Sequence, residues 1–364
     1  MIRLPHIVPL LLLCAAPPLL AAPADFDHKT CQWRPDDVDV TKLAAVLAAR
    51  HFRPPPGFRA FVAVVDVDGD AIRQLRAFDW DGQGSDPTGW NPASTVKLFS
   101  AAGAIEELRA RGLPKGGEVT FDYPHGKPMF SFGELLWQAI WESDNIAHDR
   151  LMQIAGFDRL HGPAGVLARA GLTHSAVMRA YQTRDWEAEG HSKSFKDSPG
   201  FSVKFGKRTV NVPPRQGAAT PECKNAACTS LQELSRMLCV VMLHEQLPVA
   251  DRLDLGGTKD NALLKQLREA LRTPRTQHPD GTWRAFADAF AGKKSQVFKK
   301  GGLAGGWVSD NLFIRAPGNR RYLVALAAHG GRDALDPAAR LIADALKHDA
   351  LVPPPVKAKM PKKP

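Results

Sequence analysis

The sequence has no long apolar run after its first two dozen residues, which excludes a membrane-spanning helix from the rest of the chain. It also has no pair of cysteines or histidines at the spacing that metal sites use, so we expect no metal. The net charge of +10 comes without a patch of interleaved aromatic and arginine residues. We therefore expect no nucleic-acid partner, and we interpret the charge as attraction to anionic cell-envelope polymers or as solubility.

The first 24 residues have the pattern of a secretory signal and are not expected to belong to the fold. Arg3 gives a positive start, residues 7–20 are apolar, and Ala22-Pro23-Ala24 supplies small residues for cleavage after Ala24. Lipidation at Cys14, which follows three leucines, is the alternative. We expect an exported protein, periplasmic or secreted, that is soluble or loosely held at a surface and not stably inserted in a membrane.

Four cysteines remain after such a cleavage, and an even number in an oxidising compartment favours two disulfides. Cys223 and Cys228 are close enough in sequence to close a small loop. Cys31 with Cys239 would then tie the N-terminal segment to a helix. The sequence alone leaves the pairing open.

Apolar periodicity predicts strands near both ends of the chain and helices between them. The expected strands are 61–67, 71–78, 296–300, 307–315 and 321–329. The expected helices are 38–50, 94–108, 131–140, 146–155, 229–244, 261–272 and 337–349. Between residue 94 and about residue 200 the pattern predicts no strand, after which 201–205 and 209–212 alternate as a hairpin.

This distribution predicts an α+β protein. An antiparallel sheet lobe would be built from both termini, at about 25–93 and 245–350. An all-helical lobe would be inserted at about 94–244 and would carry the extra hairpin at about 196–215, bordering a cleft between the lobes. Residues 351–364 would form a basic disordered tail. Because clefts between lobes collect binding sites, the seam near residue 94 is the place to look for function.

Ser94 and Lys97 lie three residues apart at that seam, where a predicted helix begins. Residues at this spacing share one face of a helix, so the Ser94 hydroxyl lies beside the Lys97 amine. Serine is a poor nucleophile until a base takes its proton, and lysine can do so once burial or a neighbouring cation lowers its pKa. No other Ser-x-x-Lys occurs in the chain. Two solvated neighbours on an exposed helix are the alternative interpretation.

A serine that attacks a carbonyl also needs a second proton carrier and donors for the oxyanion. Ser143-Asp144-Asn145, at a predicted helix start, could supply a hydroxyl and an amide, although these residue types also favour helix caps. Lys300-Gly301-Gly302 places a cation on an otherwise apolar strand, and its glycines permit close approach of a ligand. A strand-end lysine followed by a turn is the alternative there.

Taken in this order, Ser94-x-x-Lys97, Ser143-Asp144-Asn145 and Lys300-Gly301-Gly302 resemble the motif set of the class A β-lactamases and penicillin-binding proteins. A second Ser-Asp-Asn, at 309–311, follows the lysine motif within a predicted strand, and we assign it no catalytic role. The resemblance covers residues 38–349. It implies a two-lobe fold of the β-lactamase/D,D-peptidase type, in agreement with the predicted α+β organisation.

The resemblance implies a role for each matched residue. Ser94 would be the acylated nucleophile, Lys97 a proton acceptor, and Ser143 the relay that gives a proton to the leaving nitrogen. Lys300 would lower the local proton affinity and attract a substrate carboxylate. The implied substrate-binding residues are Asn145, which holds the substrate amide, and Gly301, Gly302 and Leu303. The backbone N–H groups of Leu303 and Ser94 would form the oxyanion hole.

Two departures separate this chain from class A β-lactamases. Those enzymes have a Ser or Thr hydroxyl where this chain has Gly301, and it helps bind the antibiotic carboxylate. They also have a Glu-x-x-Leu-Asn loop that positions the water for deacylation, and that string is absent here. Asp185, Glu187 and Glu189 lie in its region. Glu187 is the candidate deacylation base, with a solvated loop acid as the alternative. Without a base for water, an acyl-enzyme forms and persists.

The resemblance thus implies an exported serine acyl-hydrolase that needs no cofactor and is expected to be a monomer. Its expected substrate is a β-lactam or a related amide or ester. Peptidoglycan-derived D-alanyl peptides are the alternative, and they would make the protein a penicillin-sensitive D,D-peptidase. A third possibility is a catalytically silent peptidoglycan-binding protein, which the intact set of two serines and two lysines disfavours.

Overall fold

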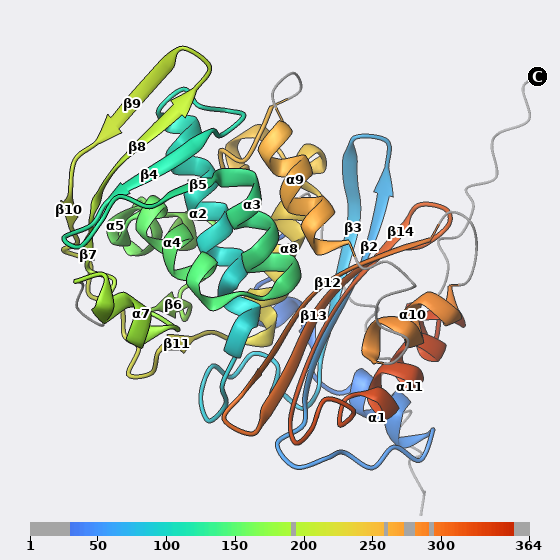
Figure 1. The fold of residues 1–364 in the computed structure, drawn as a ribbon. Helices are drawn as coiled ribbons and strands as arrows, with labels where there is room; N and C mark the ends of the chain where they lie inside the picture. Colours follow the sequence, from blue (N-terminus) through green and yellow to red (C-terminus); the bar gives the residue numbers. More distant parts are fainter. Residues whose placement is uncertain (1–29, 191–193, 258–260, 273–280, 291–294, 353–364) are drawn as a thin grey trace, which may run out of the picture.

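A six-stranded sheet built from both ends of the chain is the main feature of the computed structural model, which describes residues 30–190, 194–257, 261–272, 281–290 and 295–352 (Figure 1). Neighbouring strands pair antiparallel, except that β1 pairs parallel with β3. Across the sheet the strands are β1 (Val38–Asp39), β3 (Ala71–Asp79), β2 (Arg59–Asp68), β14 (Arg320–His329), β13 (Trp307–Arg315) and β12 (Gln296–Ala304). The predicted signal, Cys14 and residues 353–364 of the predicted tail lie outside the described residues.

Both faces of this sheet are covered, as the unbroken apolar run at 61–67 predicted. Phe61 and Ala63 pack in one core and Val62 and Val64 in the other, because successive side chains on a strand point to opposite faces. Figure 1 shows three helices on one face: α1 (Lys42–Ala48), α10 (Thr282–Ala289) and α11 (Asp336–Lys347). On the other face lies α8 (Leu231–Met242), and α2 (Lys97–Ala110) packs against α8 on the side away from the sheet.

Helix α2 is the centre of the helical part of the molecule. Every residue from Lys97 to Leu108 is buried, so neighbours surround this helix on all sides. The other helical elements of this part are η2 (Ala93–Val96), α3 (Phe132–Trp137), the π-helix η3 (Gln138–Glu142), α4 (Asn145–Ala155), α5 (Phe157–His161), α6 (Val166–Arg169), α7 (Thr183–Ala188) and α9 (Ala262–Leu271). The short 3₁₀ turns η1 (Pro35–Asp37), η4 (His244–Gln246) and η5 (Val249–Asp251) lie in connections.

The prediction that the middle of the chain is all helical is wrong. A second, four-stranded sheet packs there, in the order β5 (Met129–Ser131), β4 (Glu118–Asp122), β8 (Gly200–Phe205) and β9 (Arg208–Val212). Two-stranded pairs also form between β6 (Ala176–Val177) and β11 (Ala227–Cys228), and between β7 (Asp197–Ser198) and β10 (Arg215–Gln216). In β4 only Val119 and Phe121 are buried, and this alternation is too short to stand out in the sequence.

The hairpin expected at 201–212 is present as β8 and β9, but it does not border the site region as predicted. Arg208, at its tip, donates hydrogen bonds to the backbone oxygens of Arg111 and Gly112, beyond the C-terminal end of α2. Ser94 and Lys97 lie at the opposite end of that helix. Figure 1 likewise shows β8 and β9 along the outer edge of the helical part. The hairpin is therefore an extension of the β4 sheet.

Smaller differences concern helix ends and crosslinks. Residues 38–39 form a strand rather than the start of a helix, and α3 begins at Phe132 and continues as the π-helix η3. Both disulfides considered from the sequence are formed, Cys31–Cys239 and Cys223–Cys228. One continuous core runs from the main sheet into the helices, so the division of the chain into lobes near residues 93 and 245 remains a proposal.

Candidate active site

Ser94 lies on a sharp turn between the main sheet and α2. It is the second residue of η2, and Lys97 is the first residue of α2. In a 3₁₀ turn, side chains three apart eclipse one another, which places Lys97 below Ser94. The preceding residue, Ala93, has a left-handed backbone with φ of 50°, a conformation that costs a non-glycine residue about 1–3 kcal/mol. The turn is thus strained immediately before the candidate nucleophile.

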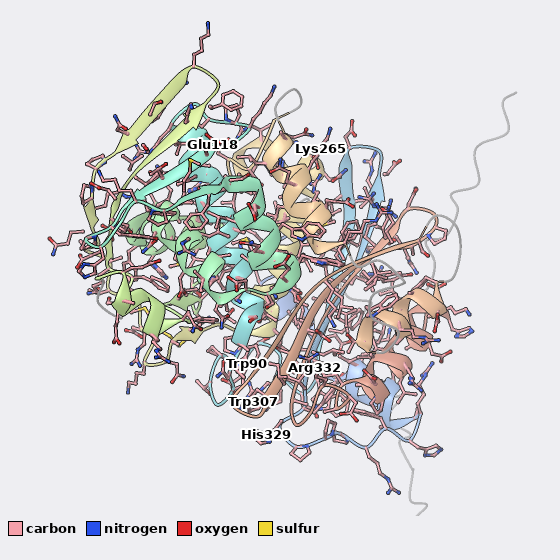
Figure 2. All side chains as sticks on the ribbon, in the orientation of Figure 1. Trp90, Glu118, Lys265, Trp307, His329 and Arg332 are labelled. Carbon is pink, nitrogen blue, oxygen red and sulfur yellow. A yellow bond between two sulfur atoms is a disulfide. The ribbon has the colours of Figure 1, made fainter. Side chains whose placement is uncertain are left out.

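Two side chains hold this strained turn. Asn91 Oδ1 accepts a hydrogen bond of 2.8 Å from the Ala93 N–H, and Tyr181 Oη donates one of 2.9 Å to the Ala93 oxygen. Trp90, just before the turn, donates from Nε1 to the Thr229 oxygen. Figure 2 labels Trp90, and Trp307 near the tip of the β12–β13 hairpin, and so locates the end of the sheet where η2 lies.

Lys97 is fully buried and hydrogen-bonded to the Ser-Asp-Asn segment. Its Nζ donates to the Ser143 oxygen at 2.5 Å, to the Asp144 oxygen at 3.0 Å and to Asn145 Oδ1 at 2.7 Å. Burial lowers the pKa of Lys97 from 10.5 to about 8, and the carboxylates of Asp144 and Asp149 partly oppose that shift. A lysine with this pKa is partly neutral in mildly alkaline solution, as a general base must be.

Ser143 connects Lys97 to Lys300. It follows η3 in a left-handed conformation with φ of 62°, so that its carbonyl faces Lys97 while its Oγ accepts a hydrogen bond of 2.8 Å from Lys300 Nζ. Lys300 is 3% exposed. Burial lowers the pKa of Lys300 well below its usual value, and the neighbouring charges of Lys97 and Lys299 lower it further. The Ser143 hydroxyl is thus bonded to one buried amine, that of Lys300, while the other, that of Lys97, is bonded to the Ser143 backbone oxygen.

Asn145 and Asp144, which follow Ser143, form different hydrogen bonds. Asn145 turns its Oδ1 toward Lys97, which leaves its Nδ2, a donor, for another acceptor such as a substrate carbonyl. Asp144 Oδ1 accepts the N–H of Ala147 at 2.7 Å and so caps α4. The capping role considered for this motif is therefore present, and it coexists with the contacts to Lys97.

β12 approaches η2 so closely that only glycine fits at position 302. A Cβ there would lie 2.7 Å from the Pro92 oxygen and 2.9 Å from the Ser94 nitrogen. β12 is also the last strand of its sheet, so the backbone groups on its outer side are available to a ligand. Leu303 follows on this strand with a half-exposed side chain. The backbone N–H groups proposed for the oxyanion hole belong to these two closely packed segments.

Glycine at position 301 has a different structural reason. A Cβ there would lie 2.6 Å from Asp310 Oδ1 on the paired strand β13. Asp310 is fixed in place by Lys299 Nζ at 3.0 Å and by Thr282 Oγ1 at 2.5 Å. The missing hydroxyl at position 301, noted from the sequence, thus coincides with a buried ion pair that fills its space.

A second group of residues, which the sequence did not single out, packs against the nucleophile turn. The Asp149 carboxylate accepts the backbone N–H groups of Tyr181 and Gln182 at 2.8 and 2.9 Å. The Tyr181 ring lies 5.8 Å from Lys97 Nζ and 4.7 Å from the ring of His148. Burial raises the pKa of Asp149 to about 7 and raises that of Tyr181. Asp149 follows Asn145 by one helical turn, and this spacing is the only signal the sequence offered.

Glu187 stays a prediction. Its side chain is exposed on α7, and the carboxylates whose charges act on Lys97 are those of Asp144 and Asp149. The Asp149 carboxylate accepts two backbone N–H groups. From the segment 176–189, the aromatic ring of Tyr181 lies 5.8 Å from Lys97 Nζ.

Comparison with known proteins gives a family model and several solved structures. The model described as the beta-lactamase enzyme family matches residues 88–347. A representative of the class A β-lactamases from Bacteroides cellulosilyticus is 14% identical over 86% of this chain and 98% of its own, with a TM-score of 0.51. A β-lactamase from Sphaerobacter thermophilus is 18% identical over 87% and 100%, with a TM-score of 0.50. These likenesses confirm the predicted α+β fold. The search of curated proteins found no match.

Proposed function

Because the chain belongs to the beta-lactamase enzyme family, we propose that it is a serine acyl-hydrolase in which Ser94 forms an acyl-enzyme. The observation that carries this proposal is the position of Ser143, hydrogen-bonded to two buried lysines, Lys97 and Lys300, beside the strained turn of Ser94. Two amines with lowered pKa values, one donating to the Ser143 hydroxyl and the other three residues from Ser94, are the groups that acyl transfer to serine requires.

In the first step, neutral Lys97 takes the proton of Ser94 while Oγ bonds to the substrate carbonyl carbon. The backbone N–H groups of Ser94 and Leu303 stabilise the oxyanion that develops. When the C–N bond breaks, the Ser143 hydroxyl gives its proton to the leaving nitrogen and recovers one from the lysines. The products are an acyl ester on Ser94 and a free amine, or an opened ring if the substrate is a β-lactam.

Lys300 and Asn145 orient the substrate in this scheme. The buried ammonium of Lys300 attracts a carboxylate, which both β-lactams and D-alanyl peptides carry, and the free Nδ2 of Asn145 binds the substrate amide. The hydroxyl that class A β-lactamases use for the same carboxylate has no counterpart, because Asp310 fills the space beside Gly301. Binding of the carboxylate therefore depends on Lys300 and the backbone of β12.

Deacylation is the slow step of the proposed reaction. A base must activate the water that cleaves the acyl ester. The side chain that lies beside Lys97, where such a base would act, is that of Tyr181. Burial raises the pKa of Tyr181, so its hydroxyl is no base at neutral pH, and it already donates to the Ala93 oxygen. This supports a long-lived acyl-enzyme, and hence a penicillin-sensitive D,D-peptidase acting on cell-wall peptides as the second candidate beside a β-lactamase.

Export to the periplasm or the outside and a monomeric state belong to the same proposal. No helix among the described residues is long and apolar enough to cross a bilayer. The disulfides Cys31–Cys239 and Cys223–Cys228 support an oxidising compartment, because such bonds persist there.

The decisive experiment follows the mass of the intact protein during incubation with penicillin. A mass increase equal to one penicillin, absent in Ser94→Ala, supports the acyl-enzyme. Persistence of that adduct for minutes or longer, with release of D-alanine from a D-alanyl-D-alanine peptide, favours the peptidase. Rapid loss of the adduct with turnover of nitrocefin favours the β-lactamase. No adduct in the wild-type protein would leave a binding protein and overturn the proposal.

A further inference from the structure

A cavity of about 980 Å³ opens at the end of α2 opposite the nucleophile turn. Glu107, which lines it, follows Lys97 by ten residues on α2, a distance of about 15 Å along the helix axis. Arg111 directly follows α2, Asp158 and Arg159 come from α5, and Arg215 begins β10. The cavity is therefore separate from the proposed active site, and its size is that of a small-molecule site.

Charge is distributed unevenly in this cavity. The carboxylate of Glu107, 2% exposed, forms ion pairs with Arg111 at 2.6 Å, Arg159 at 2.5 Å and Arg215 at 2.9 Å. Asp158 is the second acid of the lining, and its oxygens accept the N–H groups of Ala218 and Ala219. At neutral pH three guanidinium groups thus face two carboxylates. Burial lowers the pKa of Arg215, the Glu107 carboxylate partly opposes this shift, and the neighbouring charges of Arg111 and Arg159 lower the pKa further.

The three arginines differ in what they leave for a ligand. Arg215 also donates to the backbone oxygens of Gln153, Ile154 and Ala155, so its two terminal Nη groups are taken up by the end of α4 and by Glu107. Arg159 pairs with Glu107 through Nε, and its side chain is 36% exposed, so its terminal Nη groups are accessible to another acceptor. Arg111 contacts Glu107 through Nε and Nη2, which leaves Nη1. Two guanidinium edges thus remain unused at the same opening.

The remaining wall is built mainly from small apolar residues: Pro163, Ala164, Ala168, Ala218, Ala219 and Pro221. The ring of His161 adds no charge, because burial lowers its pKa to about 4. A cationic edge beside an apolar wall suits a ligand that is itself divided into an anionic head and an apolar body. Guanidinium groups bind carboxylate and phosphate through paired hydrogen bonds, which makes these the natural head groups.

We propose that this cavity is a second ligand site, which binds a small organic anion with a carboxylate or phosphate head held by Arg159 and Arg111. The apolar body of the ligand lies against the wall formed by Ala168 and the 218–221 segment. The competing interpretation is a purely structural ion-pair cluster, in which three arginines tie α2, α4 and α5 together through Glu107. The two interpretations differ in whether the cavity takes up an anion.

The test uses 8-anilinonaphthalene-1-sulfonate, an anion with an apolar body, titrated into the full-length protein while its fluorescence is recorded. We expect saturable binding that Arg159→Gln weakens about tenfold or more, because charge-assisted hydrogen bonds are lost. Arg340→Gln, an exposed arginine on α11 far from the cavity, removes the same charge and should bind as the wild type does. Displacement by pyrophosphate identifies a phosphate site, and displacement by glutarate a carboxylate site.

A second variant, Ala168→Trp, tests the cavity independently, in case Arg159→Gln loses binding through a folding defect. Ala168 is exposed on α6 and lines the cavity, so a tryptophan there fills space without touching the ion pairs. It should abolish binding while the thermal unfolding midpoint stays within a few degrees of wild type. The proposal is overturned if the probe does not bind, if Ala168→Trp binds as the wild type does, or if a folded Arg159→Gln retains full affinity.

Discussion

Acylation of Ser94 should accelerate with pH across the titration of Lys97. Burial lowers the pKa of Lys97 to about 8, and only its neutral form can accept a proton. With that pKa, the neutral fraction is about 9% at pH 7 and about 91% at pH 9. The rate constant for acylation should therefore rise about tenfold between these values and level off above pH 9.

The measurement is the second-order rate of labelling by a fluorescent penicillin, taken from pH 6 to pH 10 in buffers of constant ionic strength. Labelling is stopped with denaturant and read on a gel, and hydrolysis of the probe without protein is subtracted. Unfolding does not explain the expected rise. The folded-state pKa of Lys97 is below its unfolded value, so between about pH 8 and 10.5 the unfolded state binds more protons, and the contribution of Lys97 to stability increases as pH rises.

Three results would separate this reasoning from its alternatives. A rate that is flat from pH 7 to pH 9 would mean that Lys97 is not the base, whatever its pKa. A midpoint near 10.5 would mean that the lysine is solvated in the free protein, because a second-order rate reports the pKa of the free protein. Lys97→Arg should label at least about 10²-fold more slowly at every pH, because a guanidinium does not deprotonate in this range.

Three other substitutions test the geometry of the site. Ser143→Ala removes the hydroxyl that accepts from Lys300, so acylation should fall by about 10²- to 10⁴-fold in the same labelling assay, and a wild-type rate would exclude the relay. Tyr181→Phe leaves the oxygen of strained Ala93 without its hydrogen bond; urea unfolding should show a loss of about 1–3 kcal/mol, whereas unchanged stability would mean that the bond contributes nothing. Gly302→Ala places a methyl group 2.7 Å from the Pro92 oxygen, and the resulting displacement of β12 should slow acylation about 10²-fold. The control is Gly257→Ala, which has open space around it and should leave the acylation rate unchanged.

Much of the fold could be predicted because its signals are local. The apolar run at 61–67 predicts a strand buried on both faces, and β2 is one. Helices α8, α9 and α11 begin and end within two residues of the expected positions, because their apolar faces repeat at helical spacing. The strand β4 was missed because its five residues form a strand by pairing with the short β5 and with β8, about 80 residues later.

The site was predictable to the extent that its residues form short ordered motifs. Lys97, Ser143 and Lys300 lie far apart in the sequence but are joined by hydrogen bonds in the structure. Tyr181 had no such signal, because its position depends on the Asp149 carboxylate binding two backbone N–H groups of a loop. Nor can a sequence show why position 301 is glycine, since the reason is the side chain of Asp310 across the strand pair.

The two Ser-Asp-Asn segments show how strongly surroundings decide what the same residues do. At 143–145 the segment follows a π-helix in a left-handed turn, so its oxygens face Lys97 and Lys300. At 309–311 it lies in the middle of β13, and all three side chains are at most 5% exposed. Ser309 donates to the Pro92 oxygen, and Asn311 donates to the Leu234 oxygen. The second copy therefore stabilises the site indirectly, because Ser309 anchors the turn that carries Ser94. Of the two copies, only the first can contact a substrate.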